Sequence, residues 1–329
     1  MLSLGIESTA HTFGIGIVDD KGNVLANEKY VYQPPLGYGI IPIDAANKLR
    51  ENAESVLEKA LEKAKIRIDE VDVISFSRGP GLPPCLRVGK DFVNKILERL
   101  EKDVKIYGVN HCVAHVEIGI LKTDLKDPVT LYVSGGNTQI LAFVEKRYRC
   151  FGETLDIAIG NMLDSFAREA NLQHPGGPKI EELAKKGSYI ELPYVVKGMD
   201  FSFTGILTAA IRKLKEGIRL EDLCYSIQET CFAMLTEATE RALAHTGKEE
   251  VLLTGGVAAN KRLQEMLRIM CEERGASFAV VPSEYAGDNG AMIAWLGILM
   301  RKADYKPLKL EEIDILPKWR TEDFEVMWK

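Results

Sequence analysis

The length, composition and charge of the chain exclude several classes of protein. It has 329 residues, of which 46% are hydrophobic and 27% charged, which is typical of a globular protein and excludes a disordered chain. The length is sufficient for two lobes of ordinary domain size. The net charge of −6 indicates no general affinity for nucleic acid, and we interpret the basic groups at 146–149 and 212–215 as solvated surface.

The cysteine and hydropathy patterns favour a cytoplasmic protein. The six cysteines contain no Cys-x-x-Cys pair, so we expect buried thiols in a reducing compartment. The N-terminal segment is too short and too weakly charged for a signal peptide. No apolar run approaches the roughly 18 residues of a membrane span, so we expect no association with a membrane.

The first part of the chain predicts three strands followed by alternating helices and strands. Residues 4–30 predict a strand, a polar turn at 7–12, a strand at 13–18, a tight turn at 19–23 and a strand at 24–30. A helix is expected from Pro42 to about Lys65, because small and apolar residues recur there at helical spacing and proline suits a first turn. Further along, we expect a strand at 71–77, a Gly/Pro loop at 78–84, a helix from about Val88 and a strand at 105–109.

The second part of the chain repeats this order. A strand at 129–133 leads through a polar glycine turn at 134–138 to strands at 139–144 and 148–152. Helices are predicted at 156–171, 221–246, 258–274 and 287–302, and strands at 251–254 and 277–281. We interpret the repeat as a duplicated strand–strand–strand–helix–strand–helix unit, with one mixed sheet flanked by helices in each lobe.

Two α/β lobes that each open with a hairpin, whose polar turn faces a cleft, resemble the actin-like ATPase (ASKHA) fold. In that architecture the hairpin turns hold phosphates through main-chain donors. We expect an N-terminal lobe at 1–127 and a C-terminal lobe at 128–289 that carries most of the nucleotide contacts. The closing segment, 290–329, is expected to return to the first lobe.

One histidine pair is a candidate metal site. His111 and His115 are four residues apart, so on a helix their imidazoles share a face and can reach one ion. Asp288, at the start of a late helix, is a suitable third ligand, and Tyr132 is a further candidate. The alternative is a pair of histidines that cap a helix without a metal, and the spacing does not decide between the two. A zinc-protease motif is excluded because Cys112 stands where that motif has its glutamate.

Three glycine-pair segments are candidates for a nucleotide site. Glycine lets backbone N–H groups approach a phosphate closely, and the pairs at 135–136 and 255–256 directly follow predicted strands. Asp164 lies in a predicted helix, and Gly177 and Glu181 lie at the start of another, where Glu181 could bind a ribose hydroxyl pair. Each feature alone is weak, because a glycine turn is usually only a turn. Together with a metal site they indicate group transfer from a nucleotide-linked donor.

Seven segments resemble one known family closely. They are residues 108–115, 131–139, 151–156, 175–178, 196–205, 254–260 and 288–294. All of them are similar to the universal tRNA N6-adenosine threonylcarbamoyltransferase (TsaD) family, once labelled O-sialoglycoprotein endopeptidase. Its archaeal and eukaryotic members form the catalytic subunit of the KEOPS complex. The resemblance runs from Met1 to about Trp328 and is of the archaeal type.

The resemblance implies a reaction. A threonylcarbamoyl group would move from threonylcarbamoyl-AMP to N6 of the adenosine beside the anticodon, in tRNAs that read codons beginning with A. The partners would be tRNA and KEOPS subunits, including a small protein kinase and a small dimerisation subunit. No Ser–His–Asp or Cys–His set is evident, so we predict no covalent nucleophile.

The resemblance also implies the roles of individual residues. One iron or zinc ion would be bound by His111, His115 and Asp288, with Tyr132 nearby or ligating. The adenylate, and possibly ATP, would be bound by Tyr132, Val133, Ser134, Gly135, Gly136, Asn137, Asp164, Gly177, Glu181, Gly255, Gly256 and Asn260.

The first lobe departs from the family pattern. The histidine-rich helix start of the family is replaced by Ile41, Lys48 and Leu49, a loop glycine by Pro83, and a small-residue stretch by Lys90 and Asp91. A cysteine that is common before the late glycine signature is Ala286. The departures in the first lobe support one alternative, a weakly active or non-catalytic scaffold that binds nucleotide and metal. A small-molecule kinase of the same fold is a second alternative.

Overall fold

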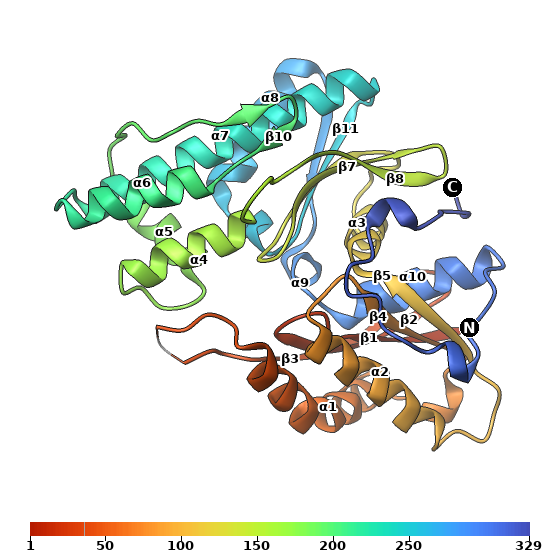
Figure 1. Cartoon of the computed structure of the whole chain (residues 1–329). Helices are drawn as coiled ribbons and strands as arrows, with labels where there is room; N and C mark the ends of the chain where they lie inside the picture. The colour runs from red at the N-terminus through yellow and green to blue at the C-terminus, as the bar shows by residue number, and fades with distance from the viewer. Residues whose placement is uncertain (36) are drawn as a thin grey trace.

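Two five-stranded mixed sheets form the frame of the protein. The computed structural model describes residues 1–35 and 37–329. The first sheet has the order β3-β2-β1-β4-β5 and the second β8-β7-β6-β11-β12, so the two have the same topology. In each, three antiparallel strands are extended by two parallel ones. The predicted duplication is therefore confirmed, and Figure 1 shows the sheets in a lower and an upper lobe.

The strands agree with the predicted elements to within a few residues. The first sheet consists of β1 (Leu2–Glu7), β2 (Thr12–Asp19), β3 (Val24–Val31), β4 (Val73–Gly79) and β5 (Lys105–Asn110). The second consists of β6 (Val129–Val133), β7 (Thr138–Val144), β8 (Arg147–Glu153), β11 (Glu250–Thr254) and β12 (Ser277–Val280). A small ribbon is formed by β9 (Val196–Lys197) and β10 (Asp200–Phe201).

The helices show where sequence patterns were misleading. They are α1 (Pro42–Ala64), α2 (Pro83–Leu97), α3 (His111–Leu121), α4 (Ile159–Glu169), α5 (Gly176–Ala184), α6 (Thr204–Lys215), α7 (Leu220–Thr246), α8 (Lys261–Arg274), α9 (Ser283–Ala286) and α10 (Gly290–Lys302). The predicted start of α2, near Val88, was late, because Pro83 occupies the first turn, where its missing N–H costs nothing. The helix α6 was not predicted.

Two apolar cores fill the lobes, and a third lies between them. The third core contains side chains of α3 and α10, Tyr132 of β6, and Phe324 and Val326 near the C-terminus. The segment after α10 accordingly contacts both lobes. Leu308 N donates to Ile106 O of β5 at 2.8 Å, and Val326 N donates to Lys146 O beside β8 at 2.7 Å. Figure 1 shows this segment along one edge of both lobes.

The helix α10 follows the last strand of the second sheet but packs against β1 and β2 of the first. The packing is backbone to backbone. A Cβ added to Gly16 would lie 2.1 Å from Ala291 N, and one added to Gly290 would lie 2.1 Å from Gly16 N. Glycine is required at both positions because any side chain would force the helix away from the sheet. The residues just before α10 are thereby fixed between the lobes.

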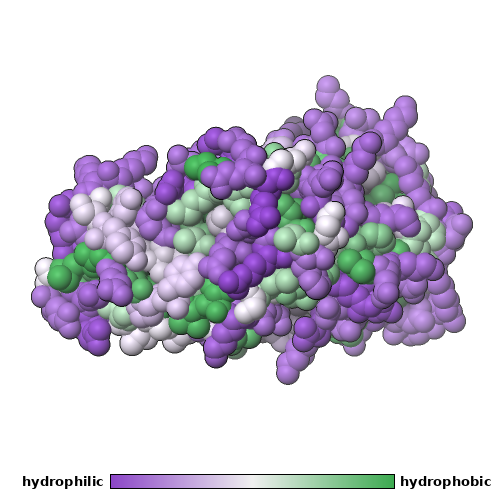
Figure 2. All heavy atoms as spheres, turned by 90° about the horizontal axis from the view of Figure 1, so that it is seen from above, coloured by the Kyte–Doolittle hydropathy of each residue, from purple (hydrophilic) through white to green (hydrophobic). Residues whose placement is uncertain are grey.

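One face of the molecule is predominantly polar. Figure 2 shows a mostly hydrophilic face with separate hydrophobic patches. Among the residues that the structure describes, no helix combines the length and the apolar character needed to span a bilayer.

Candidate metal and nucleotide site between the lobes

The histidine pair lies on the first two turns of a buried helix. Asn110, the last residue of β5, caps α3: its Oδ1 accepts hydrogen bonds from Cys112 N at 3.0 Å and Val113 N at 3.2 Å. The cap fixes the helix start at His111 and therefore places His115 one turn later on the same face. Both histidines are buried, with 3% and 0% of their surface exposed.

Asp288 reaches this helix from the far end of the chain. It lies between α9 and α10, where Asn289 caps α10 by accepting from Met292 N at 3.0 Å. Asp288 Oδ1 lies 3.3 Å from His115 Nε2 and 3.5 Å from His111 Nε2. Ligand atoms held about 2 Å from one ion lie roughly 3–3.5 Å apart, so the three side chains are arranged as metal ligands. The three form a cluster whose ligand atoms all lie within 4.8 Å of one another.

Glu7, at the end of β1, orients the first histidine. Its Oε2 lies 3.0 Å from His111 Nδ1, while its Oε1 accepts from Thr9 N at 2.7 Å and from Thr9 Oγ1 at 2.5 Å. A carboxylate on the second nitrogen fixes the ring and makes Nε2 a better metal ligand. This role was missed in the sequence. One signal was available in the sequence: Glu7 ends a mostly apolar strand, and a glutamate that is buried there needs a polar partner.

Tyr132, the residue before the last of β6, supports a metal at this point. Its ring lies against that of His115, with centroids 4.8 Å apart. Its hydroxyl group is buried and forms no hydrogen bond with any described residue, and the same is true of His115 Nδ1. A buried hydroxyl without a partner costs free energy unless something else binds it. The two imidazoles and the carboxylate, with this phenol beside His115, therefore form a donor set that could hold a metal ion.

The charges of the cluster depend on one another. Burial opposes a charge on His111, but Glu7 and Asp288 outweigh it and raise the pKa of this imidazole to about 9. Burial lowers the pKa of His115, and the charge of His111 acts in the same direction. Burial raises the pKa of Asp288, but His115 and His111 outweigh it, so the net effect is a lowered pKa. At neutral pH and without a metal, the cluster therefore consists of a protonated His111, a neutral His115 and an ionised Asp288.

Metal binding should release close to one proton at pH 7. A metal ligand must be deprotonated, and below its pKa of about 9 the metal-free His111 carries a proton that the ion displaces. Apparent affinity should therefore rise about tenfold per pH unit from pH 6 and level off near pH 9. Calorimetry in buffers of different ionisation enthalpy measures the release. Glu7→Gln removes the main stabilising charge, so the release should fall; an equal release in this variant would contradict the assignment.

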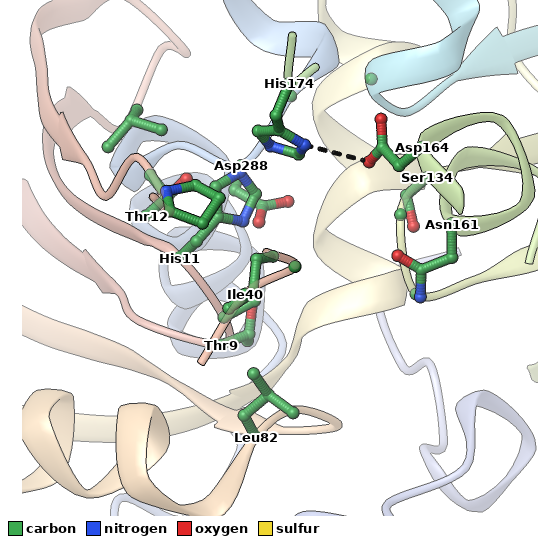
Figure 3. Close-up of a pocket in the computed structure, with 18 of the residues that line it drawn as sticks. Thr9, His11, Thr12, Ile40, Leu82, Ser134, Asn161, Asp164, His174 and Asp288 are labelled. Carbon is green, nitrogen blue, oxygen red and sulfur yellow. Dashed lines mark ion pairs between the residues drawn. The ribbon is translucent and has the colours of Figure 1, made fainter. Parts of the chain in front are cut away.

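His111 and Asp288 of this cluster line a cavity between the lobes. The cavity has a volume of about 880 Å³ and is lined by the β1–β2 turn of the first lobe and the β6–β7 turn of the second. Figure 3 shows Thr9, His11 and Asp288 on one side, with Ser134, Asn161 and Asp164 on the other. A site of this size that both lobes enclose suits a nucleotide.

The β6–β7 turn is closed by its own bonds. Ser134 N donates to Asn137 O at 2.8 Å, and Asn137 N donates to Ser134 Oγ at 3.0 Å. A Cβ on Gly136 would meet nothing within 4 Å, so this glycine leaves open space in which a ligand can approach the backbone. Gly160 serves packing instead, because a Cβ there would lie 2.6 Å from Ser134 O. The start of α4 is thereby held against the turn.

The structure brings most, but not all, of the predicted residues to the cavity. Those that line it are His111, Tyr132, Ser134, Gly135, Gly136, Asn137, Asp164, Gly256 and Asp288. His115 lies behind this wall, and Val133 is buried in the core of the second lobe. The glycine pairs also contain packing positions: Gly255 has φ +97° and its Cβ would lie 2.2 Å from Val133 O.

Three of the predicted nucleotide residues, Asp164, Glu181 and Asn260, accept hydrogen bonds from backbone N–H groups at the starts of helices. Asp164 Oδ1 accepts from Gly176 N at 2.7 Å and so holds the start of α5, which contains Gly177. Asn260 caps α8 by accepting from Arg262 N at 2.9 Å, and Glu181 accepts from Lys261 N at 2.8 Å. Glu181 lines a second groove, of about 810 Å³. Asn260 thus precedes α8, whereas the sequence placed it in the first turn of that helix.

The fold and the site define a class of protein. The chain resembles T. kodakarensis HypF (TM-score 0.63, 16% identity, 95% of this chain and 49% of that one). It also resembles component A of the (R)-2-hydroxyglutaryl-CoA dehydratase of Acidaminococcus fermentans (TM-score 0.55, 14% identity, 91% and 98%). These likenesses show the fold alone: the protein has the two-lobed actin-like ATPase fold, as predicted.

Sequence comparison identifies the family within this class. The model of the TsaD family, tRNA N6-adenosine threonylcarbamoyltransferase, matches residues 22–295, and the chain belongs to this family of transferases. It is 56% identical to the tRNA N6-adenosine threonylcarbamoyltransferase of Archaeoglobus fulgidus over the full length of both chains. A Methanocaldococcus jannaschii relative named "probable bifunctional tRNA threonylcarbamoyladenosine biosynthesis protein" is 55% identical. The chain spans about 60% of the length of that relative and of others with the same name.

Proposed function

We propose that this protein transfers the threonylcarbamoyl group of threonylcarbamoyl-AMP to N6 of the adenosine beside the anticodon of tRNAs that read codons beginning with A. The observation that carries the proposal is the His111–His115–Asp288 cluster, of which His111 and Asp288 line the same cavity as the Ser134–Asn137 turn. A metal site and a phosphate-sized turn in one cleft suit a donor that has both a phosphate and an acyl group.

The chain's residues would divide the work as follows. His111, His115 and Asp288 would hold an iron or zinc ion, which when bound polarises an oxygen of the donor. The β6–β7 turn would bind the phosphate of AMP through its backbone, near the positive end of α4. The exocyclic amine of adenine is a weak nucleophile, so the reaction depends on a good leaving group and on fixed positions of both reactants.

The departures in the first lobe are compatible with this function. Leu49 is fully buried in the first-lobe core, so it contributes packing where the family has a histidine. Lys48 is exposed and pairs with Glu51 at 2.7 Å. Neither side chain lines the cavity, whereas the metal cluster and the β6–β7 turn are complete. We therefore favour an active transferase over a scaffold.

We also propose partners. The relatives named bifunctional extend beyond the part that this chain matches, which supports a second protein working beside it. KEOPS subunits, including a small protein kinase and a small dimerisation subunit, are the expected partners. The tRNA would bind across the mouth of the cavity.

The direct test is a transfer assay. The protein is loaded with Fe²⁺ or Zn²⁺ and incubated with threonylcarbamoyl-AMP, unmodified tRNA and the partner subunits, and the nucleosides are analysed by mass spectrometry. We expect threonylcarbamoyladenosine, and none with a matched tRNA that has guanosine at the target position. Metal and AMP binding without any product, with the partners present, would support the scaffold instead.

A further inference from the structure

The turn between β1 and β2 holds one histidine firmly at the cavity wall. Leu82 N donates to Thr9 O at 2.7 Å, and Tyr32 N donates to His11 O at 2.8 Å. The turn is thus tied to the start of α2 on one side and to the end of β3 on the other. Because the backbone of the turn is held from both sides, the position of the His11 Cα is fixed relative to the cavity.

Nδ1 of the His11 ring has no hydrogen-bond partner among the residues that the structure describes. This nitrogen is buried, although the ring lines the cavity. Across the cleft it faces His174 of the second lobe, with ring centroids 6.4 Å apart and planes at 79°. Figure 3 shows His11 beside Thr12 and Asp288, with His174 above them and joined to Asp164. A buried ring nitrogen without a partner in a ligand cavity is a site for a ligand's hydrogen bond.

Most other ionisable groups on the cavity wall have a bonding partner or a proposed role as a metal ligand. His111 and Asp288 belong to the metal cluster, and Asp164 is engaged by Gly176 N and by His174 Nδ1 at 3.5 Å. Burial raises the pKa of Tyr132 well above its usual value, so this phenol remains protonated without a metal. Lys29 Nζ donates to Asp288 O at 3.3 Å, and the guanidinium group of Arg168 has no acceptor atom. The charged or titratable groups around His11 are Lys29 of β3, Asp288 before α10, His111 of α3, and His174 and Asp164 of the second lobe.

We propose that His11 is a catalytic residue that accepts the proton of the attacking amine. This inference rests on the proposed transfer. The N6 nitrogen of adenine forms a bond to the carbamoyl carbon, and the bond from that carbon to the phosphate oxygen of AMP breaks. AMP leaves with the electron pair of that bond. The nitrogen must then lose one proton, which passes to a free ring nitrogen of His11 and from there to solvent. Atoms and charge balance without a further reactant.

The test compares single-turnover transfer by wild type, His11→Gln, His11→Ala and a matched control, His245→Ala, whose ring is exposed at the end of α7. Loss of a general base typically lowers a rate by about 10²- to 10⁴-fold, and we expect this for both His11 variants. Metal content and AMP binding should be unchanged. Added imidazole should partly restore His11→Ala.

The outcomes separate this inference from the function on which it rests. If wild type transfers but a His11 variant keeps the wild-type rate, or loses activity only because metal or AMP no longer binds, the proton-acceptor role is wrong and the proposed function stands. If the transfer rate falls in His174→Ala but not in the His11 variants, then the proton acceptor lies on the second lobe, and this result would also overturn the inference. If wild type makes no threonylcarbamoyladenosine with its partners present, the proposed function fails and this inference with it.

Discussion

Replacing Asp288 with asparagine should abolish stable metal binding and lower transfer by at least about 100-fold. The change keeps the volume and removes only the charge of the carboxylate, whose Oδ1 lies 3.3 Å from His115 Nε2 and 3.5 Å from His111 Nε2. Two imidazoles and a neutral amide would remain, and these bind a divalent ion poorly. Metal per chain, measured by plasma mass spectrometry after gel filtration, and the transfer rate are the two readouts.

A matched control makes this result specific to the site. Asp124→Asn removes a carboxylate from the exposed loop after α3 and should change neither metal content nor rate. Asp288→Asn should also remain folded, because the cap of α10 is the neighbouring Asn289 and not Asp288. If Asp288→Asn binds metal as tightly as wild type does, then the ion is bound elsewhere in the protein.

Local patterns predicted most of the fold because each element satisfies a local rule. The helix α1 begins at Pro42, as the sequence predicts, and buries its apolar positions along one face. Most strands of the two sheets are apolar runs bounded by turns, so their positions and their repetition could be read directly. The strands β3 and β8 contain many polar residues and were placed by the turns that precede them. The first sheet and the second have the same order of strands because the same order of local signals occurs twice.

The site could be predicted only in part, because it depends on contacts between distant segments. The four-residue spacing of His111 and His115 could be read from the sequence. Asn110 places both histidines on one face of α3 because its cap fixes the start of this helix. The partnership of Glu7 with His111 joins residues 104 positions apart and has no local signature. His11 was visible only as one polar residue in a turn. Its fixed position depends on bonds from β3 and from the start of α2, which follow from the tertiary fold.

Gly16→Ala should destabilise the protein and weaken the metal site together. The added Cβ would lie 2.1 Å from Ala291 N and 2.2 Å from Gly290 C, which are backbone atoms that cannot rotate away. Overpacking of this kind typically costs about 1–3 kcal/mol, so the melting temperature should fall by several degrees. Because the start of α10 must move, Asp288, two residues earlier, should shift relative to the histidines, and metal affinity should fall as well.

Gly136→Ala is the matched comparison, since the same methyl group there meets nothing within 4 Å. Its melting temperature should equal that of wild type, while AMP binding should weaken because the methyl group occupies the open side of the β6–β7 turn. Thermal melts and calorimetry with AMP and metal test both variants. If Gly16→Ala melts at a lower temperature but binds metal as tightly as wild type, then α10 does not position Asp288. An equal fall in melting temperature and in metal affinity in both variants would point to a general defect, because of these two glycines only Gly16 lies where the helix and sheet backbones touch.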